Sequence, residues 1–232
     1  MAVTFYSVQV PNDEFHKKLG GGIPKGTFGV IVGESGSGKS IVCQRMVYGL
    51  LRNDVSVTYL STQFTTVDFV KQMSSIGYSV EKYIISGKLK FFPVYPLISL
   101  VKKRKDYVNK LISARHVFDS DVVFIDSLSS LLKFDLNRES AIDLVAFLKR
   151  FTAAGNSVIV TILPGEIDDE SLLEIEASST FLAECTLRKF GTDIKNTMTI
   201  KKYNLAPAQY QKQIAFRVEP KIGLVVEIAA VA

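Results

Sequence analysis

Tryptophan is absent from the 232-residue sequence, cysteine and histidine occur twice each, and no apolar run reaches the length needed to span a bilayer. The longest apolar stretch, residues 91–101, is broken by Pro93 and Pro96. The two cysteines, Cys43 and Cys185, have no metal-ligand spacing and do not suggest a disulfide framework. The N-terminus lacks the charged-then-apolar order of a signal peptide. We therefore expect a soluble cytoplasmic protein without direct membrane insertion, whose cysteines are small core residues.

The excess of one charge sign is also small, because 28 lysines and arginines oppose 23 aspartates and glutamates, giving a net charge of +5. This balance permits acidic partners but does not require them. The only dense basic run, Lys102–Lys105, falls early in a predicted helix from Ile98 to Phe118. A solvated helix face is its ordinary interpretation, and a docking patch for an acidic partner is the alternative. No basic stretch carries the aromatics that stack on single strands, so we expect no nucleic-acid partner.

The most informative segment that is present is Gly33–Ser40, GESGSGKS, which fits the pattern GxxxxGK[ST] of a phosphate-binding loop (Walker A). An apolar run of strand length, residues 27–32, precedes it, and apolar residues at helical spacing follow it through Leu51. Glycines let the backbone wrap a phosphate closely, and the N-terminus of the following helix supplies partial positive charge. The predicted nucleotide-binding residues are Ser35, Gly36, Ser37, Gly38, Lys39 and Ser40, with the Ser40 hydroxyl also on Mg²⁺.

A strand that ends in an aspartate (Walker B) completes the predicted site. The run Val122–Ile125 is apolar throughout and ends at Asp126, as expected for a buried parallel strand whose carboxyl end holds the water shell of Mg²⁺. Asp121 begins the same strand and therefore belongs to the opposite edge of the sheet. The serines of 127–130 either contact nucleotide or cap the following helix, and we favour capping.

Strand and helix patterns alternate through the first two-thirds of the chain, and strands dominate the remainder. This order predicts an α/β fold with a mostly parallel central sheet flanked by helices and finished by antiparallel strands, in one domain over residues 1–232. Residues 165–179, rich in Asp and Glu, are predicted to be a loop or a short helix. The remaining predicted strands are 55–60, 88–92, 122–125, 157–163, 181–187, 197–201, 214–218 and 224–228, and the further helices are 66–74 and 139–153.

Two further segments carry a family resemblance. Leu19–Gly26, immediately before the first strand, resembles the lead-in of KaiC-like ATPases of the RecA superfamily, and Asp126–Ser129 is similar to their DS-x-S/T ending. The resemblance covers about residues 5–225. The single-domain length and the segment Tyr59–Phe64 most resemble the accessory ATP-binding proteins of the archaellum (archaeal flagellum) motor.

The resemblance implies a RecA-like P-loop core that binds ATP and Mg²⁺. It also implies a homo-oligomeric, hexameric ring in the cytoplasm, peripheral to the membrane. By the same resemblance, its partners are the archaellum motor ATPase and a membrane-anchored scaffold of the same machine.

Two departures from the family pattern bear on mechanism. KaiC-like enzymes that hydrolyse ATP have paired glutamates where this chain has Gln63 and Phe64. A glutamine can orient water but cannot accept its proton, and loss of a general base typically removes on the order of 10²–10⁴-fold in rate. Glu34, inside the loop, is the nearest spare carboxylate in the sequence and is a doubtful base beside phosphates. Where family members carry Lys-x-Arg, this chain has Lys201 and Tyr203; Lys201 either acts in trans on a neighbour's nucleotide or is a charged residue on an exposed strand end.

These features favour a nucleotide-regulated assembly module whose ATP hydrolysis is weak or absent. The alternatives are an active KaiC-like ATPase, in which Gln63 positions the water, and a RecA-like DNA-binding protein. The DNA-binding alternative ranks third because fold-level analogy alone does not carry function.

Overall fold

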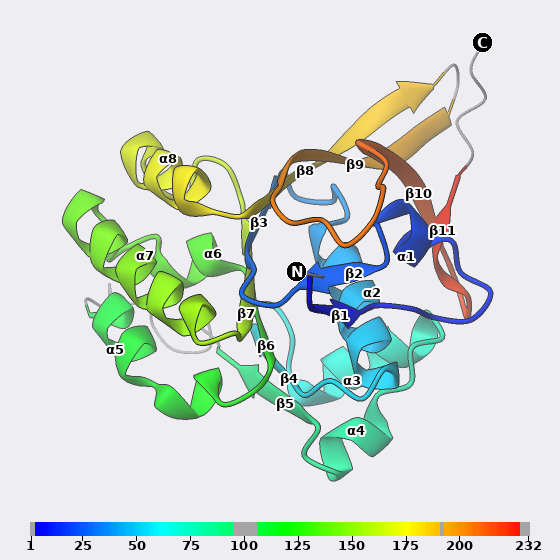
Figure 1. The fold of residues 1–232 in the computed structure, drawn as a ribbon, viewed down its shortest axis with the longest axis horizontal. Coiled ribbons are helices and arrows are strands. Elements are labelled where there is room, and N and C mark those ends of the chain that lie inside the picture. Colours follow the sequence, from blue (N-terminus) through cyan, green and yellow to red (C-terminus); the bar gives the residue numbers. More distant parts are fainter. Residues whose placement is uncertain (1–2, 95–105, 191–192, 228–232) are drawn as a thin grey trace.

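A nine-stranded sheet forms the centre of the computed structural model, which describes residues 3–94, 106–190 and 193–227 (Figure 1). The strand order is β11-β10-β9-β8-β3-β7-β6-β4-β5. Neighbours from β8 to β5 pair in parallel, and β9, β10 and β11 continue the sheet in antiparallel pairs. The strands are β3 (Phe28–Gly33), β4 (Val57–Ser61), β5 (Leu89–Pro93), β6 (Val122–Asp126), β7 (Ser157–Ile162), β8 (Phe181–Phe190), β9 (Asp193–Tyr203), β10 (Gln213–Glu219) and β11 (Gly223–Val226).

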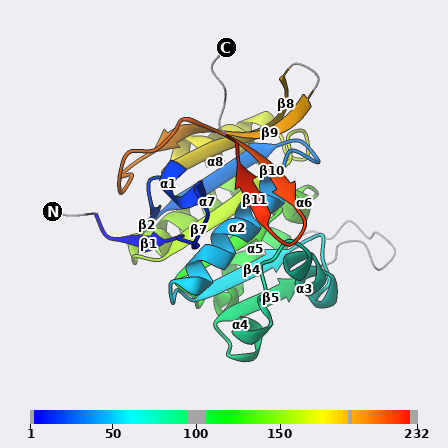
Figure 2. The ribbon, with the colours of Figure 1, turned by 90° about the vertical axis from the view of Figure 1, so that its right-hand side faces the viewer.

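Helices cover both faces of the parallel part of this sheet, as the two views in Figures 1 and 2 show. One face carries α2 (Lys39–Arg52) and α3 (Thr66–Ser75), with α4 (Glu81–Ile85) near its edge. The other carries α5 (Tyr107–Ser113), α6 (Leu128–Leu132), α7 (Arg138–Ala153) and α8 (Asp169–Ser178). Because both faces are covered, β3, β4, β6 and β7 are buried along their whole length, and most of their residues are apolar.

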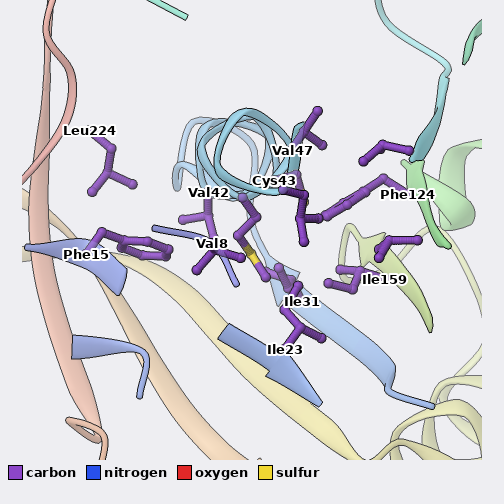
Figure 3. Close-up of a cluster of buried hydrophobic side chains, with 14 of the residues drawn as sticks. Val8, Phe15, Ile23, Ile31, Val42, Cys43, Val47, Phe124, Ile159 and Leu224 are labelled. Atoms are coloured by element: carbon purple, nitrogen blue, oxygen red, sulfur yellow. The ribbon is translucent and has the colours of Figure 1, made fainter. Parts of the chain in front are cut away.

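The two covered faces enclose two apolar clusters. The first lies between the sheet and α2, where Val42, Cys43 and Val47 of the helix meet Ile31 and Phe124 of the strands (Figure 3). The second lies under α5 to α8. Cys43 and Cys185 are free and buried in the first cluster, which confirms their prediction as core residues.

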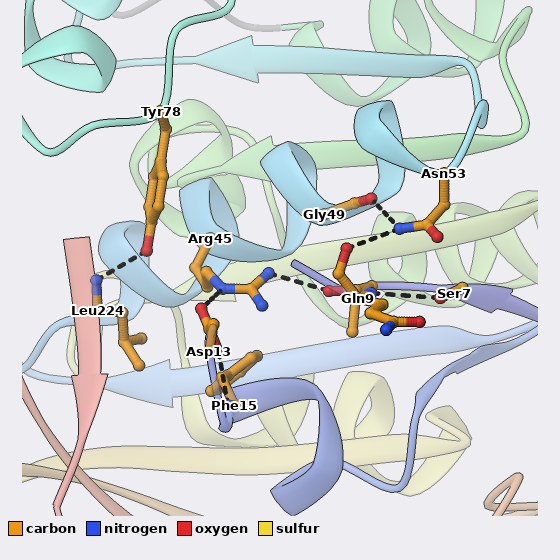
Figure 4. Close-up of polar contacts among 10 residues, drawn as sticks. Ser7, Gln9, Asp13, Phe15, Arg45, Gly49, Asn53, Tyr78 and Leu224 are labelled. Atoms are coloured by element: carbon orange, nitrogen blue, oxygen red, sulfur yellow. Dashed lines mark hydrogen bonds and ion pairs between the residues drawn. The ribbon is translucent and has the colours of Figure 1, made fainter. Parts of the chain in front are cut away.

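An N-terminal ribbon that the sequence patterns did not predict packs onto α2. It consists of β1 (Phe5–Ser7), which pairs antiparallel with β2 (Gly22–Pro24), and the short helix α1 (Phe15–Lys18) between them. Arg45 of α2 is wholly buried and ties the segment down: its Nε donates to Asp13 Oδ2 at 2.5 Å and its Nη1 donates to the Val8 carbonyl at 3.0 Å (Figure 4).

The predicted fold class is confirmed: an α/β sheet, mostly parallel, with antiparallel strands at its C-terminal end. The predicted helix over residues 98–118 is wrong in the part that the structure describes, residues 106–118. Instead of continuing to Phe118, α5 ends at Ser113 and a separate 3₁₀ turn follows at Arg115–Phe118, because Ala114 leaves the helical region with φ −78° and ψ 63°. The basic run Lys102–Lys105 lies outside the described residues. Within the described ranges, no helix combines the length and apolar character needed to cross a membrane.

Candidate nucleotide-binding site

The glycine-rich loop joins the end of β3 at Gly33 to the start of α2 at Lys39. Gly36 and Gly38 adopt positive φ angles of 78° and 93°, a backbone that side chains rarely permit. A Cβ on Gly38 would also lie 2.7 Å from Cζ of Phe216, so the close approach of β10 requires glycine there. Gly38 is the N-cap of α2, and no side chain bonds to the first turn. The N-terminus of α2 therefore presents free N–H groups, as an anion site needs.

Lys39 points its ammonium group back along the loop. Nζ donates to the carbonyls of Gly33 at 2.5 Å and Glu34 at 2.8 Å, and the residue is 9 % exposed. Burial lowers the pKa of Lys39, and the negative charge of Asp126 opposes that shift. Lys39 begins α2 at the carboxyl end of β3, and Asp126 ends β6, so both lie at the carboxyl edge of the parallel strands, as a shared site for Mg²⁺ and phosphate requires.

Asp126 lies at the carboxyl end of β6, which is separated from β3 by β7 alone, and is 1 % exposed. Its two oxygens accept one hydroxyl each: Oδ2 accepts from Tyr59 at 2.6 Å and Oδ1 accepts from Thr161 at 2.6 Å. Tyr59 is wholly buried, and this burial, followed by the charge of Asp126, raises the pKa of its phenol well above the usual value. The phenol therefore stays protonated and remains a donor to the carboxylate.

The residues present fit a nucleotide phosphate chain with Mg²⁺. The loop supplies the glycine cradle and the free N–H groups, Lys39 a cation, Ser40 a half-buried hydroxyl in the first turn of α2, and Asp126 a carboxylate. The Ser37 hydroxyl is an additional polar group, since its oxygen is buried without a hydrogen-bond partner among the described residues. It lines a cavity of about 320 Å³ between the loop, Pro164 and residues 184–187 of β8.

Gln63 and Phe64 follow β4, at the same edge of the sheet as Asp126. Gln63 is exposed, and its backbone N–H donates to Ser61 Oγ at 3.1 Å. Phe64 is partly buried and packs against the apolar cluster around α2, so its side chain contributes to the core. The side chain of Gln63 is thus the polar group at the position where the resemblance to KaiC-like enzymes implies glutamates.

Sequence reasoning named Glu34 as the nearest spare carboxylate and missed Glu166. Glu34 is exposed. Glu166 lies in the loop after β7 and accepts hydrogen bonds from Ser129 Oγ at 2.8 Å and Ser130 Oγ at 2.6 Å. Its charge is also one of those that act on the Lys39 ammonium. The available signal was topological, because a loop after a strand that pairs with both β3 and β6 must reach the edge where Asp126 lies.

The serine segment after Asp126 caps a helix, as predicted. Ser127 is the N-cap of α6, and its side chain accepts from the Ser130 N–H at 3.3 Å. Ser127 Oγ also lies 2.9 Å from Ser129 Oγ, which connects the cap to the Glu166 contacts.

Lys201 lies on β9, at a register shift: Leu182 of β8 pairs with Lys202, while Ala183 pairs with Ile200. Lys201 is thus the extra residue of a β-bulge, a feature that redirects side chains. Its ammonium forms an ion pair with Glu184 at 3.0 Å. Tyr203, which the resemblance aligns with an arginine, donates its hydroxyl to the Gly22 carbonyl and packs edge-on against Phe181.

The sequence is similar to those of known proteins. Residues 12–228 match the family described as "ATPase: KaiC". The chain is 47% identical to the archaeal flagellar ATP-binding protein FlaH of Methanocaldococcus jannaschii, over 97% of both chains. It is 38% identical to the FlaH of Methanococcus voltae, over 98% of this chain and 99% of that one.

Two solved structures are also similar to this chain. The crystal structure of the flagellar accessory protein FlaH from Methanocaldococcus jannaschii superposes with a TM-score of 0.93 at 46% identity, over 97% of this chain and 100% of that one. A KaiC-like protein of Pyrococcus horikoshii gives a TM-score of 0.75 at 21% identity, over 97% and 100% of the two chains, and supports the fold alone.

Proposed function

The chain belongs to the KaiC family of ATPases and, within it, to the archaeal flagellar ATP-binding proteins FlaH, and we propose that it is a nucleotide-regulated accessory subunit of the archaellum motor. The observation that carries the proposal is the combination of a fitting phosphate cradle and buried Asp126 with an exposed glutamine, Gln63, where hydrolysing relatives have glutamates. The whole chain, residues 1–232, acts in this proposal as one ATP-binding domain.

The chain's own groups bind rather than cleave. N–H groups of the loop and of the α2 N-terminus hold the phosphates, and Lys39 neutralises part of their charge. Ser40 and, through water, Asp126 would hold Mg²⁺, and the ion would offset further phosphate charge. The amide of Gln63 can orient a water molecule but cannot take its proton, so hydrolysis is weak or absent.

A nucleotide that is not turned over can still act as a switch, provided that it binds one state of the protein more tightly than another. We assign this role to ring assembly. Lys201, redirected by the bulge and paired with the partly exposed Glu184, is the cation offered to a neighbouring subunit's nucleotide. The assembled ring would dock on the motor ATPase and on a membrane-anchored scaffold of the same machine.

The bound nucleotide tests the hydrolysis part of this proposal. Purified protein is incubated with ATP and Mg²⁺ for hours, free ligand is removed, and the retained nucleotide is identified by chromatography. Intact ATP is the expected result, and Lys39→Ala should retain none. Bound ADP with released phosphate would instead establish an active ATPase. Retention by Lys39→Ala equal to that of the unmodified protein would refute the site assignment.

Oligomer size tests the switch. Light scattering after gel filtration should give a larger species with ATP than with ADP or without nucleotide. Lys201→Ala should weaken that response, whereas Lys149→Ala, an exposed lysine on α7, should leave it intact. One size under all three conditions would refute nucleotide-regulated assembly even if ATP binds.

A further inference from the structure

The Asp126 carboxylate receives one hydroxyl from each of the two strands that flank β6, and we infer that Tyr59 and Thr161 are positioning residues that set how tightly the site holds Mg²⁺. The inference rests on the proposed function, because it concerns the metal that accompanies ATP. It goes beyond that function by assigning the strength of metal binding to two side chains that do not belong to the loop.

The sheet register explains why both hydroxyls reach one carboxylate. Asp126 pairs with Ser61 of β4, and Tyr59 lies two residues back on the same face, so its long ring spans the diagonal to Oδ2. On the other side, Val160 of β7 pairs with Ile125, which brings Thr161 level with Asp126 and its hydroxyl to Oδ1.

The two hydrogen bonds hold the carboxylate in one orientation and still leave acceptor sites on its oxygens. An ionised carboxylate offers about four lone-pair sites, and two hydroxyls occupy two of them. The remaining sites are the ones that can accept from water molecules of a metal shell. Because each oxygen is bonded separately, rotation of the carboxylate breaks both hydrogen bonds.

The donors are themselves held rigidly. The Tyr59 ring lies among three aromatic rings, with centroids 5.0 Å from Phe69, 6.0 Å from Phe91 and 6.1 Å from Phe124. Both Tyr59 and Thr161 are wholly buried, so water cannot compete for Asp126 from their side. Partners that orient a metal-binding group in this way commonly control metal affinity.

A purely structural role for these hydroxyls makes a different prediction, and the chain offers matched controls. The Tyr78 hydroxyl is also buried, but it accepts the Leu224 N–H at 2.7 Å. The Thr58 hydroxyl is equally buried, and it lies 2.9 Å from Ser120 Oγ. Removing these two hydroxyls perturbs the core without touching Asp126.

The test measures ATP binding by calorimetry over a series of Mg²⁺ concentrations and again in excess EDTA. Tyr59→Phe and Thr161→Val are each expected to raise the Mg²⁺ concentration for half-maximal enhancement on the order of 10-fold, the low end of the loss typical for such partners. ATP affinity in EDTA should stay within about 2-fold of the unmodified protein. Tyr78→Phe and Thr58→Val should leave the Mg²⁺ midpoint unchanged, and thermal melts of all four report the stability cost separately.

Unchanged Mg²⁺ midpoints in Tyr59→Phe and Thr161→Val, with any loss confined to the melts, would overturn the inference and leave the proposed function standing. Equal shifts in the control variants would also overturn it, since the effect would then be general to the core. If the unmodified protein bound no ATP at any Mg²⁺ concentration, the proposed function would fail and this inference with it.

Discussion

Substitution of Asp13 by asparagine removes the negative charge of the buried ion pair that fastens the N-terminal segment to the helix of the glycine-rich loop (Figure 4). Asp13 also accepts the Phe15 N–H at Oδ1, so a single oxygen must then serve both that donor and Arg45 Nε. The Arg45 side chain is 0 % exposed and that of Asp13 only 12 %. Asparagine keeps the shape of the side chain and one oxygen but removes the charge. The Arg45 guanidinium then remains in the interior with the Val8 carbonyl as its only other protein acceptor among the described contacts, because Nη2 has no partner there.

The burial of the ion pair sets the expected loss in unfolding free energy. Breaking a buried ion pair by removing one partner typically costs about 3–5 kcal/mol, because the remaining charge is uncompensated. Asparagine still offers an oxygen, and the partial exposure of Asp13 admits some water, so we expect the low end, about 3 kcal/mol of unfolding free energy. Adding Arg45→Met removes the stranded charge, and the double variant should therefore recover at least about 1 kcal/mol of that loss.

The assay is urea unfolding followed by far-ultraviolet circular dichroism, since the chain has no tryptophan to report by fluorescence. Asp119→Asn is the control: it removes the partner of Lys90 from an ion pair whose aspartate side chain is 74 % exposed, and it should produce no resolvable change. A loss below about 1 kcal/mol for Asp13→Asn, or a double variant less stable than the single one, would refute the reasoning.

Three further outcomes are expected. Gly38→Ala should weaken ATP binding about 5- to 30-fold in calorimetry, because left-handed strain of about 1–2 kcal/mol falls on the phosphate-binding loop. Gly155→Ala has the same backbone strain but open space around it and no place in the loop, so it should bind ATP normally. Gln63→Glu restores a carboxylate after β4 and should raise phosphate release above that of the unmodified protein; an unchanged rate would contradict the role of the missing base. Burial raises the pKa of Cys185 to about 12 and also raises that of Cys43, so neither thiol should react with a disulfide reagent before unfolding. Unfolded thiols titrate near pH 8.5, so these groups should not change stability below about pH 8 and should lower it by up to about 1.4 kcal/mol per pH unit each as the pH rises further.

Local sequence patterns correctly predicted the elements whose signals lie within one short segment of the chain. The order of apolar strand, glycine loop and apolar helix around Gly33–Ser40 appears in the fold as predicted, and so does the buried strand that ends at Asp126. The short-helix alternative for residues 165–179 is also correct, since α8 spans Asp169–Ser178. In each case the evidence lies within one element: periodicity, a turn signal or a cap.

Other features depend on contacts between distant residues and left no local signal. The ribbon of β1 and β2 is held by pairs of residues 15 to 19 positions apart and by Arg45, which in the sequence looks like an ordinary polar residue of a helix. Tyr59 looks like one more apolar member of a buried strand until the register brings it beside Asp126. Glu166 could be found only once the neighbours of β7 were known.

Tyr203 joins two parts of the molecule that lie far apart in the sequence. Its hydroxyl donates to the Gly22 carbonyl of β2, and its ring packs edge-on against Phe181 of β8. Tyr203→Arg would release that hydrogen bond and bring a guanidinium against Phe181. A substitution at this end of β9 therefore also loosens the N-terminal ribbon, so the sequences of the two segments constrain each other.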